Sequence, residues 1–208
     1  MPYTLYEVNA FTANGQSGNP AGVVLDADGL TEQDMQALAT EAGFAETAFV
    51  RAHDQATYEL RFFTQTNEVD ICGHATVAAW SLMYQKGLLD AGEYTQQTLA
   101  GLLRISIRGS GLVFMQQNKA DFYEKVPVSE ILSLVGADET MFPGTLKPQI
   151  VSTGIRDLLI PVSNKSVLGK LVPDLAEITE FSRGRRISGL HFFSIPGGES
   201  ESVAAARN

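Results

Sequence analysis

Residues Gly73–Lys86, with the sequence GHATVAAWSLMYQK, form the stretch that decides the fold. The segment has few polar interruptions and is followed by Gly87, the residue type that most often ends a helix. A helix this apolar is normally buried on most of its sides. We therefore predict a central helix over residues 73–86 that the rest of its domain encloses.

The segments on either side of this helix favour many strands and few further helices. The expected strands are Tyr3–Phe11, Ala21–Leu25, Glu46–Arg51, Tyr58–Thr64, Gly101–Ile107, Gly111–Gln116, two within Gln149–Val162, and Leu190–Ile195. A helix is expected to open at Thr31, with Asp34 completing a capping box, and others to cover Val128–Val135 and Pro173–Phe181. This mixture predicts an α+β fold in which a curved sheet wraps a buried helix.

The composition limits the size of the fold and the class of partner. The chain has 208 residues, 44% of them hydrophobic, which suffices for one large domain or two small ones. Its formal net charge of −9 repels phosphate backbones, so we expect no nucleic-acid partner. No apolar run approaches membrane-spanning length, and the N-terminus has no basic and apolar regions of a signal peptide. We expect a cytoplasmic protein without a membrane partner.

The polar crossing Asn118–Pro127 is the expected boundary between two domains, residues 1–118 and 119–208. The chain has a single cysteine, Cys72, which excludes a disulfide within the chain and fits a reducing compartment. Cys72 and the three histidines are far apart in sequence or lack the usual ligand spacing, so they make no recognisable zinc pattern. We expect no metal site and no cofactor.

The start of the central helix is suited to hold an anion. Cys72, Gly73 and His74 lie where an expected strand turns into the buried helix. Free backbone N–H groups and the positive end of the helix dipole point at whatever precedes such a helix. Gly73 lets a ligand approach the backbone closely, and His74 can donate to an anion or relay a proton. A tight turn with a satisfied histidine is the alternative interpretation.

Three further polar residues stand close to these elements. Glu46 begins the apolar segment ETAFVR, where a carboxylate is expected to be partly desolvated and suited to proton transfer. A strand-end glutamate that faces water is the alternative. Asn19, before Pro20, either orients a substrate or stabilises a turn. Asp70 is a possible site residue, but its position favours a solvated loop carboxylate or a local cap.

Three segments, in this order and at this spacing, resemble the phenazine-biosynthesis PhzF family, within the diaminopimelate-epimerase-like fold. They are GNPAG at 18–22, ETAF at 46–49 and RFFTQTNEVDICGHAT at 61–76. The resemblance implies two pseudo-symmetric domains of curved sheet, each around a central helix. It also implies a homodimeric, cofactor-independent isomerase that moves a proton between carbons of a small carboxylate-bearing metabolite. Glu46 would be its general acid/base, and Asn19, Gly73 and His74 would bind the substrate.

The chain departs from the family pattern at its end. Family members continue past the position of Asn208 into a turn that opens a second central helix. We therefore expect the second domain to be incomplete, with a C-terminal fragment or a second copy to complement it. Two rival interpretations remain. One is a two-base racemase or epimerase that uses Cys72, as the sister families of proline racemases and diaminopimelate epimerases do; the other is a catalytically inactive binding protein. We expect Cys72 to be buried and structural.

Overall fold

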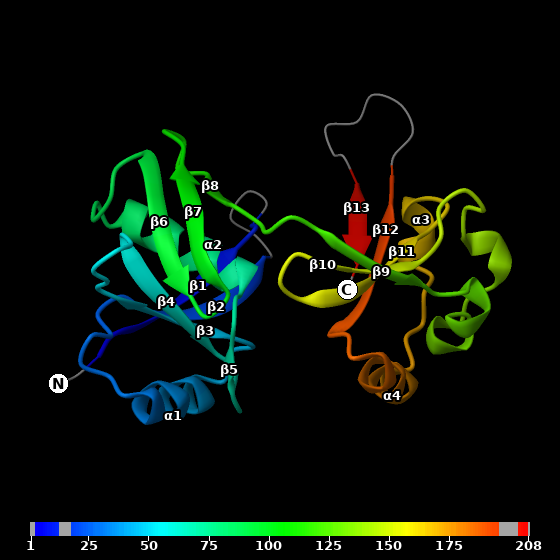
Figure 1. The fold of residues 1–208 in the computed structure, drawn as a ribbon, viewed down its shortest axis with the longest axis horizontal. Helices are drawn as coiled ribbons and strands as arrows, with labels where there is room; N and C mark the ends of the chain where they lie inside the picture. The colour runs from blue at the N-terminus through cyan, green and yellow to red at the C-terminus, as the bar shows by residue number, and fades with distance from the viewer. Residues whose placement is uncertain (1–2, 13–17, 196–203, 208) are drawn as a thin grey trace. The chain divides into compact units, whose positions relative to one another are not determined.

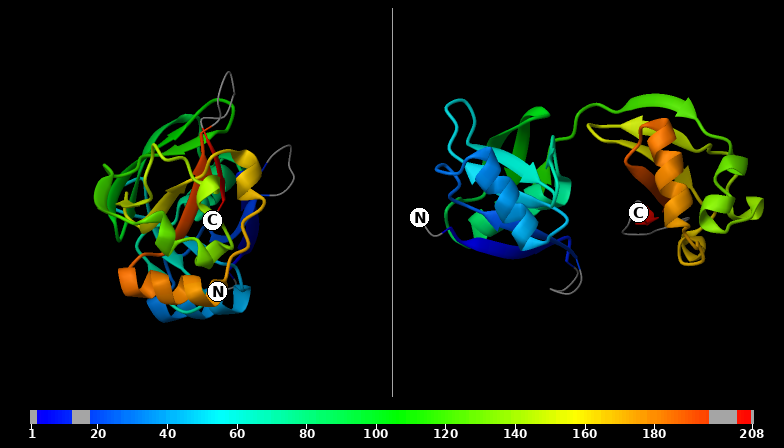
Figure 2. Two further views of the ribbon diagram at one scale, coloured as in Figure 1. Left: turned by 90° about the vertical axis from the view of Figure 1, so that its right-hand side faces the viewer. Right: turned by 90° about the horizontal axis from the view of Figure 1, so that it is seen from below.

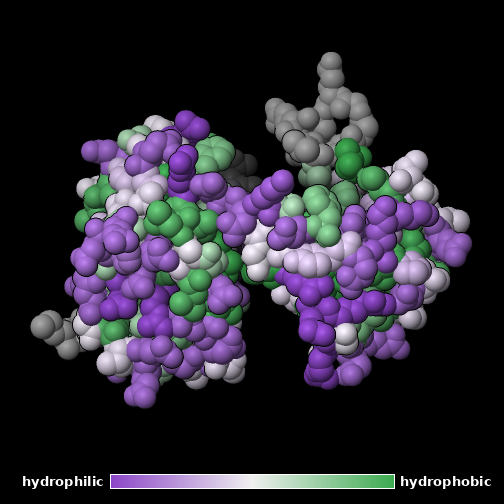
Figure 3. Space-filling view, viewed as in Figure 1, coloured by the Kyte–Doolittle hydropathy of each residue, from purple (hydrophilic) through white to green (hydrophobic). Residues whose placement is uncertain are grey.

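A computed structural model describes residues 3–12, 18–195 and 204–207 of the chain. The chain divides into two compact units, Met1–Gln117 and Asn118–Asn208, each with its own sheet and hydrophobic core. Hydrophilic side chains cover much of the visible face of both units (Figure 3). Among the described residues, no helix is both long enough and apolar enough to cross a membrane.

The first unit is a curved sheet around a helix. Its strands follow the order β1-β2-β3-β4-β6-β7-β8, with β5 paired to β4. Their bounds are β1 Leu5–Ala10, β2 Asn19–Val24, β3 Thr47–Arg51, β4 Tyr58–Phe63, β5 Glu68–Val69, β6 Gly92–Thr98, β7 Gly101–Ile107 and β8 Val113–Met115. The sheet curls around α2, Gly73–Gln85 (Figure 1). The predicted central helix and the α+β class are confirmed.

Both faces of this sheet are covered by a helix. The helix α1, Glu32–Ala42, begins at Thr31, whose hydroxyl accepts from the N–H of Asp34 at 3.2 Å, so the predicted capping box is confirmed. It lies along the outer face of the sheet (Figure 2) and packs with Phe49. The neighbouring Ala48 and Val50 pack on the other face with α2. Successive strand residues point to opposite faces, which explains why β3 is buried from Thr47 to Val50.

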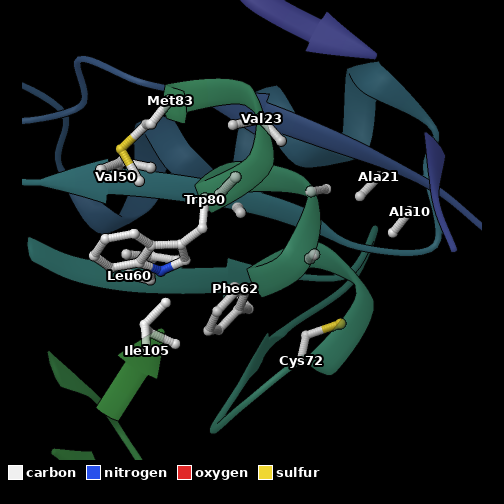
Figure 4. Close-up of a cluster of buried hydrophobic side chains, with 14 of the residues drawn as sticks. Ala10, Ala21, Val23, Val50, Leu60, Phe62, Cys72, Trp80, Met83 and Ile105 are labelled. Atoms are coloured by element: carbon white, nitrogen blue, oxygen red, sulfur yellow. The ribbon is translucent and has the colours of Figure 1, made fainter. Parts of the chain in front are cut away.

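The core around α2 combines apolar packing with one buried polar network. Trp80 is fully buried, and Leu60, Phe62 and Ile105 gather beside it, with Cys72 at the first turn of the helix (Figure 4). These contacts fix the position of α2 within the sheet. The strand β6 was not predicted, because its sequence GEYTQQT is polar. Its buried side chains are stabilised by hydrogen bonds rather than by an apolar pattern.

The second unit has a sheet with the order β13-β12-β11-β10-β9. The strand bounds are β9 Asp121–Lys125, β10 Gln149–Ser152, β11 Arg156–Pro161, β12 Gly189–Ser194 and β13 Ala205–Arg207. β11 and β12 are parallel and are connected through α3, Lys165–Leu168, and α4, Leu175–Arg185. The expected helix from Pro173 starts two residues later because Asp174 caps it, accepting from the N–H groups of Ala176 and Glu177, each at 3.0 Å.

The prediction of a helix over Val128–Val135 was wrong. The segment forms two 3₁₀ turns, η1 Val128–Glu130 and η2 Ser133–Val135, and a third, η3 Glu139–Met141, follows. Residues three apart eclipse one another in a 3₁₀ turn. Ile131, which follows η1, and Leu134, within η2, are both buried in the core of this unit, and Gly136, in the left-handed conformation, ends the segment.

Candidate active site

The contact between β2 and β3 positions Glu46. Glu46 directly precedes β3, and its carbonyl oxygen accepts from the N–H of Gly22 at 3.1 Å. Gly22 pairs with Thr47 across the two parallel strands. A Cβ on Gly22 would lie 2.7 Å from the hydroxyl oxygen of Thr47, closer than side chains pack. The glycine at this position is thus required for the close approach that holds the backbone of Glu46 in place.

The first turn of α2 leaves room for a ligand beside its backbone. Cys72 is the N-cap in an extended conformation, and helical hydrogen bonding begins with the N–H of Thr76 donating to the Cys72 carbonyl at 3.0 Å. A Cβ on Gly73 would meet only the Cε of Met115, at 3.8 Å, which is an ordinary contact. Packing within the protein therefore does not demand a glycine here. A helix N-terminus of this kind favours the binding of an anion.

The structure brings Glu46, Cys72 and His74 together. His74 lies between the other two: its Nδ1 is 3.3 Å from Sγ of Cys72, and its Nε2 is 3.4 Å from Oε2 of Glu46. The side chain of His74 is 11% exposed and that of Glu46 is 25% exposed. A carboxylate that is mostly buried but still reachable is well placed to exchange protons with a bound molecule.

The protonation state of Cys72 determines which nitrogen of His74 can act as a donor. Burial raises the pKa of its thiol to about 12; the N–H groups of Ala75 and His74 oppose the shift, and the nearby charge of Glu46 adds to it. The thiol therefore keeps its proton at neutral pH and can donate it to Nδ1 of His74. In the neutral imidazole the remaining N–H is then on Nε2, which faces Glu46. That arrangement makes His74 a donor toward the carboxylate or toward a ligand beside it.

Asn19 and Asp70 lie outside this cluster. Asn19 is the exposed first residue of β2 and pairs with Ala10 of β1. Gly18, with φ of +99°, sets the turn before it; a Cβ there would lie 2.6 Å from the Ala10 oxygen. Asp70 is exposed, and its carbonyl oxygen accepts from the N–H of Ala100 at 3.2 Å. Among the described residues, neither side chain hydrogen-bonds to the cluster.

The residue that anchors α2 to the sheet was not predicted from the sequence. Gln96 of β6 is fully buried; its Oε1 accepts from Nε1 of Trp80 at 2.8 Å, and its Nε2 donates to the hydroxyl of Thr76 at 3.4 Å. Thr76 lies in the first turns of α2, close to His74. The indole N–H of Trp80 requires a buried partner, which is a signal in the sequence, but its partner is 16 residues away.

The comparisons with known proteins identify the family. The PhzC-PhzF family of phenazine biosynthesis-like proteins matches residues 8–201. This chain belongs to the PhzC-PhzF family. A relative from Clostridium acetobutylicum, named as an uncharacterized isomerase, is 32% identical over 213 residues, covering 99% of this chain and 70% of the relative. The predicted resemblance is thus confirmed, and the relatives of this PhzC-PhzF chain are named as isomerases, that is, as enzymes.

Solved structures show the same fold for this PhzC-PhzF chain. The PhzF-family phenazine biosynthesis protein of Bacillus anthracis matches with a TM-score of 0.87 and 30% identity, over 100% of this chain and 72% of that one. A probable proline racemase from Agrobacterium radiobacter matches with a TM-score of 0.58 at 13% identity, over 94% and 68% of the two chains. The second match concerns the fold alone. It places the curled sheets in the epimerase-like class that the sequence predicted.

Proposed function

We propose that this chain is an isomerase that moves a proton between carbons of a small carboxylate-bearing metabolite, with Glu46 as the general acid/base and no cofactor. The observation that carries the proposal is the position of the Glu46 carboxylate beside His74, at the start of α2. One carboxylate can take a proton from one carbon and return it to another.

The binding roles follow from the same geometry. The N–H of Gly73 at the start of α2, together with the helix dipole, would hold the carboxylate of the substrate. His74 would donate to the bound anion or to Glu46. Asn19, exposed at the start of β2, would orient the substrate from the edge of the site. We further propose that the enzyme works in the cytoplasm. It would act there as a homodimer or paired with a C-terminal fragment.

The raised thiol pKa disfavours a racemase that uses Cys72 as a base. Such a base must be a thiolate near neutral pH, whereas burial raises the pKa of Cys72 to about 12. The carboxylate of Glu46 is the stronger candidate because it needs no such activation. Cys72 then acts through its hydrogen bond with His74 rather than as the group that removes a proton.

The test is deuterium exchange in heavy water. Small carboxylic acids with an acidic C–H beside a double bond or carbonyl are incubated with the protein and followed by NMR. We expect one of them to take up deuterium, and Glu46→Gln to slow the exchange by about 10²–10⁴-fold. Glu41→Gln is the matched control: Glu41 is exposed on α1, and this substitution removes the same charge as Glu46→Gln does. Equal exchange rates in the wild type and Glu46→Gln would remove Glu46 from the mechanism.

A further inference from the structure

Three ligand types that divalent transition metals favour converge at the start of α2. Glu46, Cys72 and His74 each offer one ligand atom, and these atoms all lie within 4.8 Å of one another. The sequence does not indicate this set, because Glu46 precedes β3, far from α2 in the chain, and Cys72 and His74 lack the usual ligand spacing. The fold brings these three side chains together although their spacing in the sequence does not indicate a metal site.

We propose that Glu46, Cys72 and His74 form a binding site for Zn²⁺, and that the bound ion stops the proton transfer. The binding goes beyond the proposed function, in which these groups hold substrate and carry a proton. Only the second half of the proposal, the block of turnover, rests on that function. A bound ion would occupy the carboxylate that must otherwise remain free.

The donor set fits the ion. Zn²⁺ binds thiolate, imidazole and carboxylate at roughly 2.0–2.3 Å, which separates neighbouring ligand atoms of a tetrahedral site by roughly 3.3–3.7 Å. The sulfur of Cys72 lies 3.3 Å from Nδ1 of His74, and Oε2 of Glu46 lies 3.4 Å from Nε2. The two distances involve different nitrogens of His74: an ion on Nδ1 needs a rotation of Glu46 to bring the third ligand, and an ion on Nε2 needs a rotation of Cys72. Three protein ligands leave the fourth position open.

A second observation points to a ligand at this place. Nε2 of His74 is buried; among the described residues Oε2 of Glu46 approaches it to 3.4 Å, but without the geometry of a hydrogen bond. A buried polar atom without a partner is costly unless something binds it. The net charge of −9 also raises the local concentration of cations around the protein. Binding displaces the thiol proton of Cys72 into the solvent, as metal binding to cysteine generally does.

The experiment is a titration of the metal-free protein with Co²⁺, a spectroscopic substitute for Zn²⁺. We expect a near-ultraviolet thiolate-to-cobalt charge-transfer band that saturates at one equivalent and disappears when Zn²⁺, which binds more tightly, is added. Cys72→Ser should abolish the band. His74→Asn and Glu46→Gln should weaken binding by at least about 10-fold, the size of effect seen even when only a supporting group is lost. His191→Asn, which removes a histidine of the second unit, should match the wild type.

The outcomes separate the site from the function. No charge-transfer band in the wild-type protein overturns the proposal, whatever the variants do. A band that survives in Cys72→Ser, or affinity that is unchanged in His74→Asn, overturns the assignment of ligands; circular dichroism shows that each variant is folded. Absorption reports binding without any turnover, so a failure of the isomerase proposal leaves this test intact. Tight Zn²⁺ binding with undiminished deuterium exchange would overturn the blocking role.

Discussion

The two units share a pair of parallel strands connected through helical chain, but they differ in how the faces of their sheets are covered. Each connects a pair of parallel strands through helical chain, β2–α1–β3 in the first unit and β11–α3–α4–β12 in the second. In the first unit a further helix, α2, packs on the other face of the sheet. In the described residues of the second unit, α3 and α4 pack on the face that carries Leu158 and Ile160. On the opposite face, Leu159 and His191 are only partly buried.

The covering of the sheet on both faces explains why the candidate site lies in the first unit. The cluster of Glu46, Cys72 and His74 lies in the unit whose sheet is covered on both faces, so packing fixes the backbone beneath each side chain. The buried amide of Gln96 there has a hydrogen-bond partner at each end. In the second unit, by contrast, the carboxylate of Asp157 lines a largely apolar cavity of about 440 Å³.

The largest effect is expected from breaking the doubly covered core. Trp80→Ala removes a fully buried indole and leaves Oε1 of Gln96 without its donor. The cavity alone should cost about 3–5 kcal/mol of unfolding free energy, and the unpaired acceptor adds to that. Hydrogen exchange followed by mass spectrometry should show protection lost throughout the first unit and kept in the second.

Ile160→Ala is the matched change in the second unit, where Ile160 is also fully buried. It should cost about 2–5 kcal/mol and reduce protection there while the first unit keeps its own. Equal loss of protection in both units after either substitution would show that the chain unfolds as one cooperative whole. The comparison between two separately stabilised units would then be wrong.

The second prediction separates a glycine that packing requires from one that a ligand requires. Gly73→Ala has room for its Cβ, so we expect unfolding free energy to rise by about 0.4–1 kcal/mol through the unfolded state. The new methyl group occupies the proposed anion site, and the deuterium-exchange rate should fall on the order of 10²-fold, as for a displaced substrate. Urea denaturation and the exchange assay measure the two effects on the same samples.

Gly22→Ala is the contrasting control. Its Cβ would lie 2.7 Å from Oγ1 of Thr47, so this change should destabilise the protein by about 1–3 kcal/mol. Similar destabilisation by both substitutions would mean that Gly73 also serves packing. Unchanged exchange in a stable Gly73→Ala protein would take the helix N-terminus out of substrate binding.

The sequence predicted the elements whose local pattern matches their burial. The helix over 73–86 and the capping box at Thr31 were found because apolar residues or cap residues stand next to one another in the chain. The strand β6 was missed because Gln96 and Thr98 are buried polar residues whose stabilising partners are distant or backbone groups. The 3₁₀ turns of Val128–Val135 were missed because the choice between them and a helix depends on packing in the second core.

The candidate site shows the same division. Cys72, Gly73 and His74 are consecutive, so a helix N-terminus with anion-binding chemistry could be predicted from their order. That Glu46 lies 3.4 Å from His74 could not be derived from spacing, because it depends on the parallel pairing of β2 with β3. The roles of Asn19 and Asp70 remain predictions. Their side chains are exposed, and the local pattern alone does not separate a binding role from a turn.

The smallest effect concerns the polar group that the second unit leaves in an apolar cavity. Burial raises the pKa of Asp157 above its ordinary value, and nearby His191 and the N–H of Gly189 offset only part of the shift. The folded protein thus binds this proton more tightly than the unfolded chain, so stability falls as pH rises from the ordinary pKa through the raised one. Asp157→Asn should remove that loss and raise stability at neutral pH by less than about 1 kcal/mol, since water at the half-open cavity screens the charge.

Asp138→Asn, in the same unit, should change the stability in the opposite direction. Asp138 accepts from the hydroxyl and from the N–H of Thr140, which lowers its pKa, so its contribution is present above the ordinary value and is lost as pH falls through the lowered one. Urea midpoints at about pH 4.5 and pH 7 should therefore rise for Asp157→Asn chiefly at the higher pH and fall for Asp138→Asn. An Asp157→Asn protein that is less stable than the wild type at pH 7 would mean that the charged carboxylate is stabilised in its cavity.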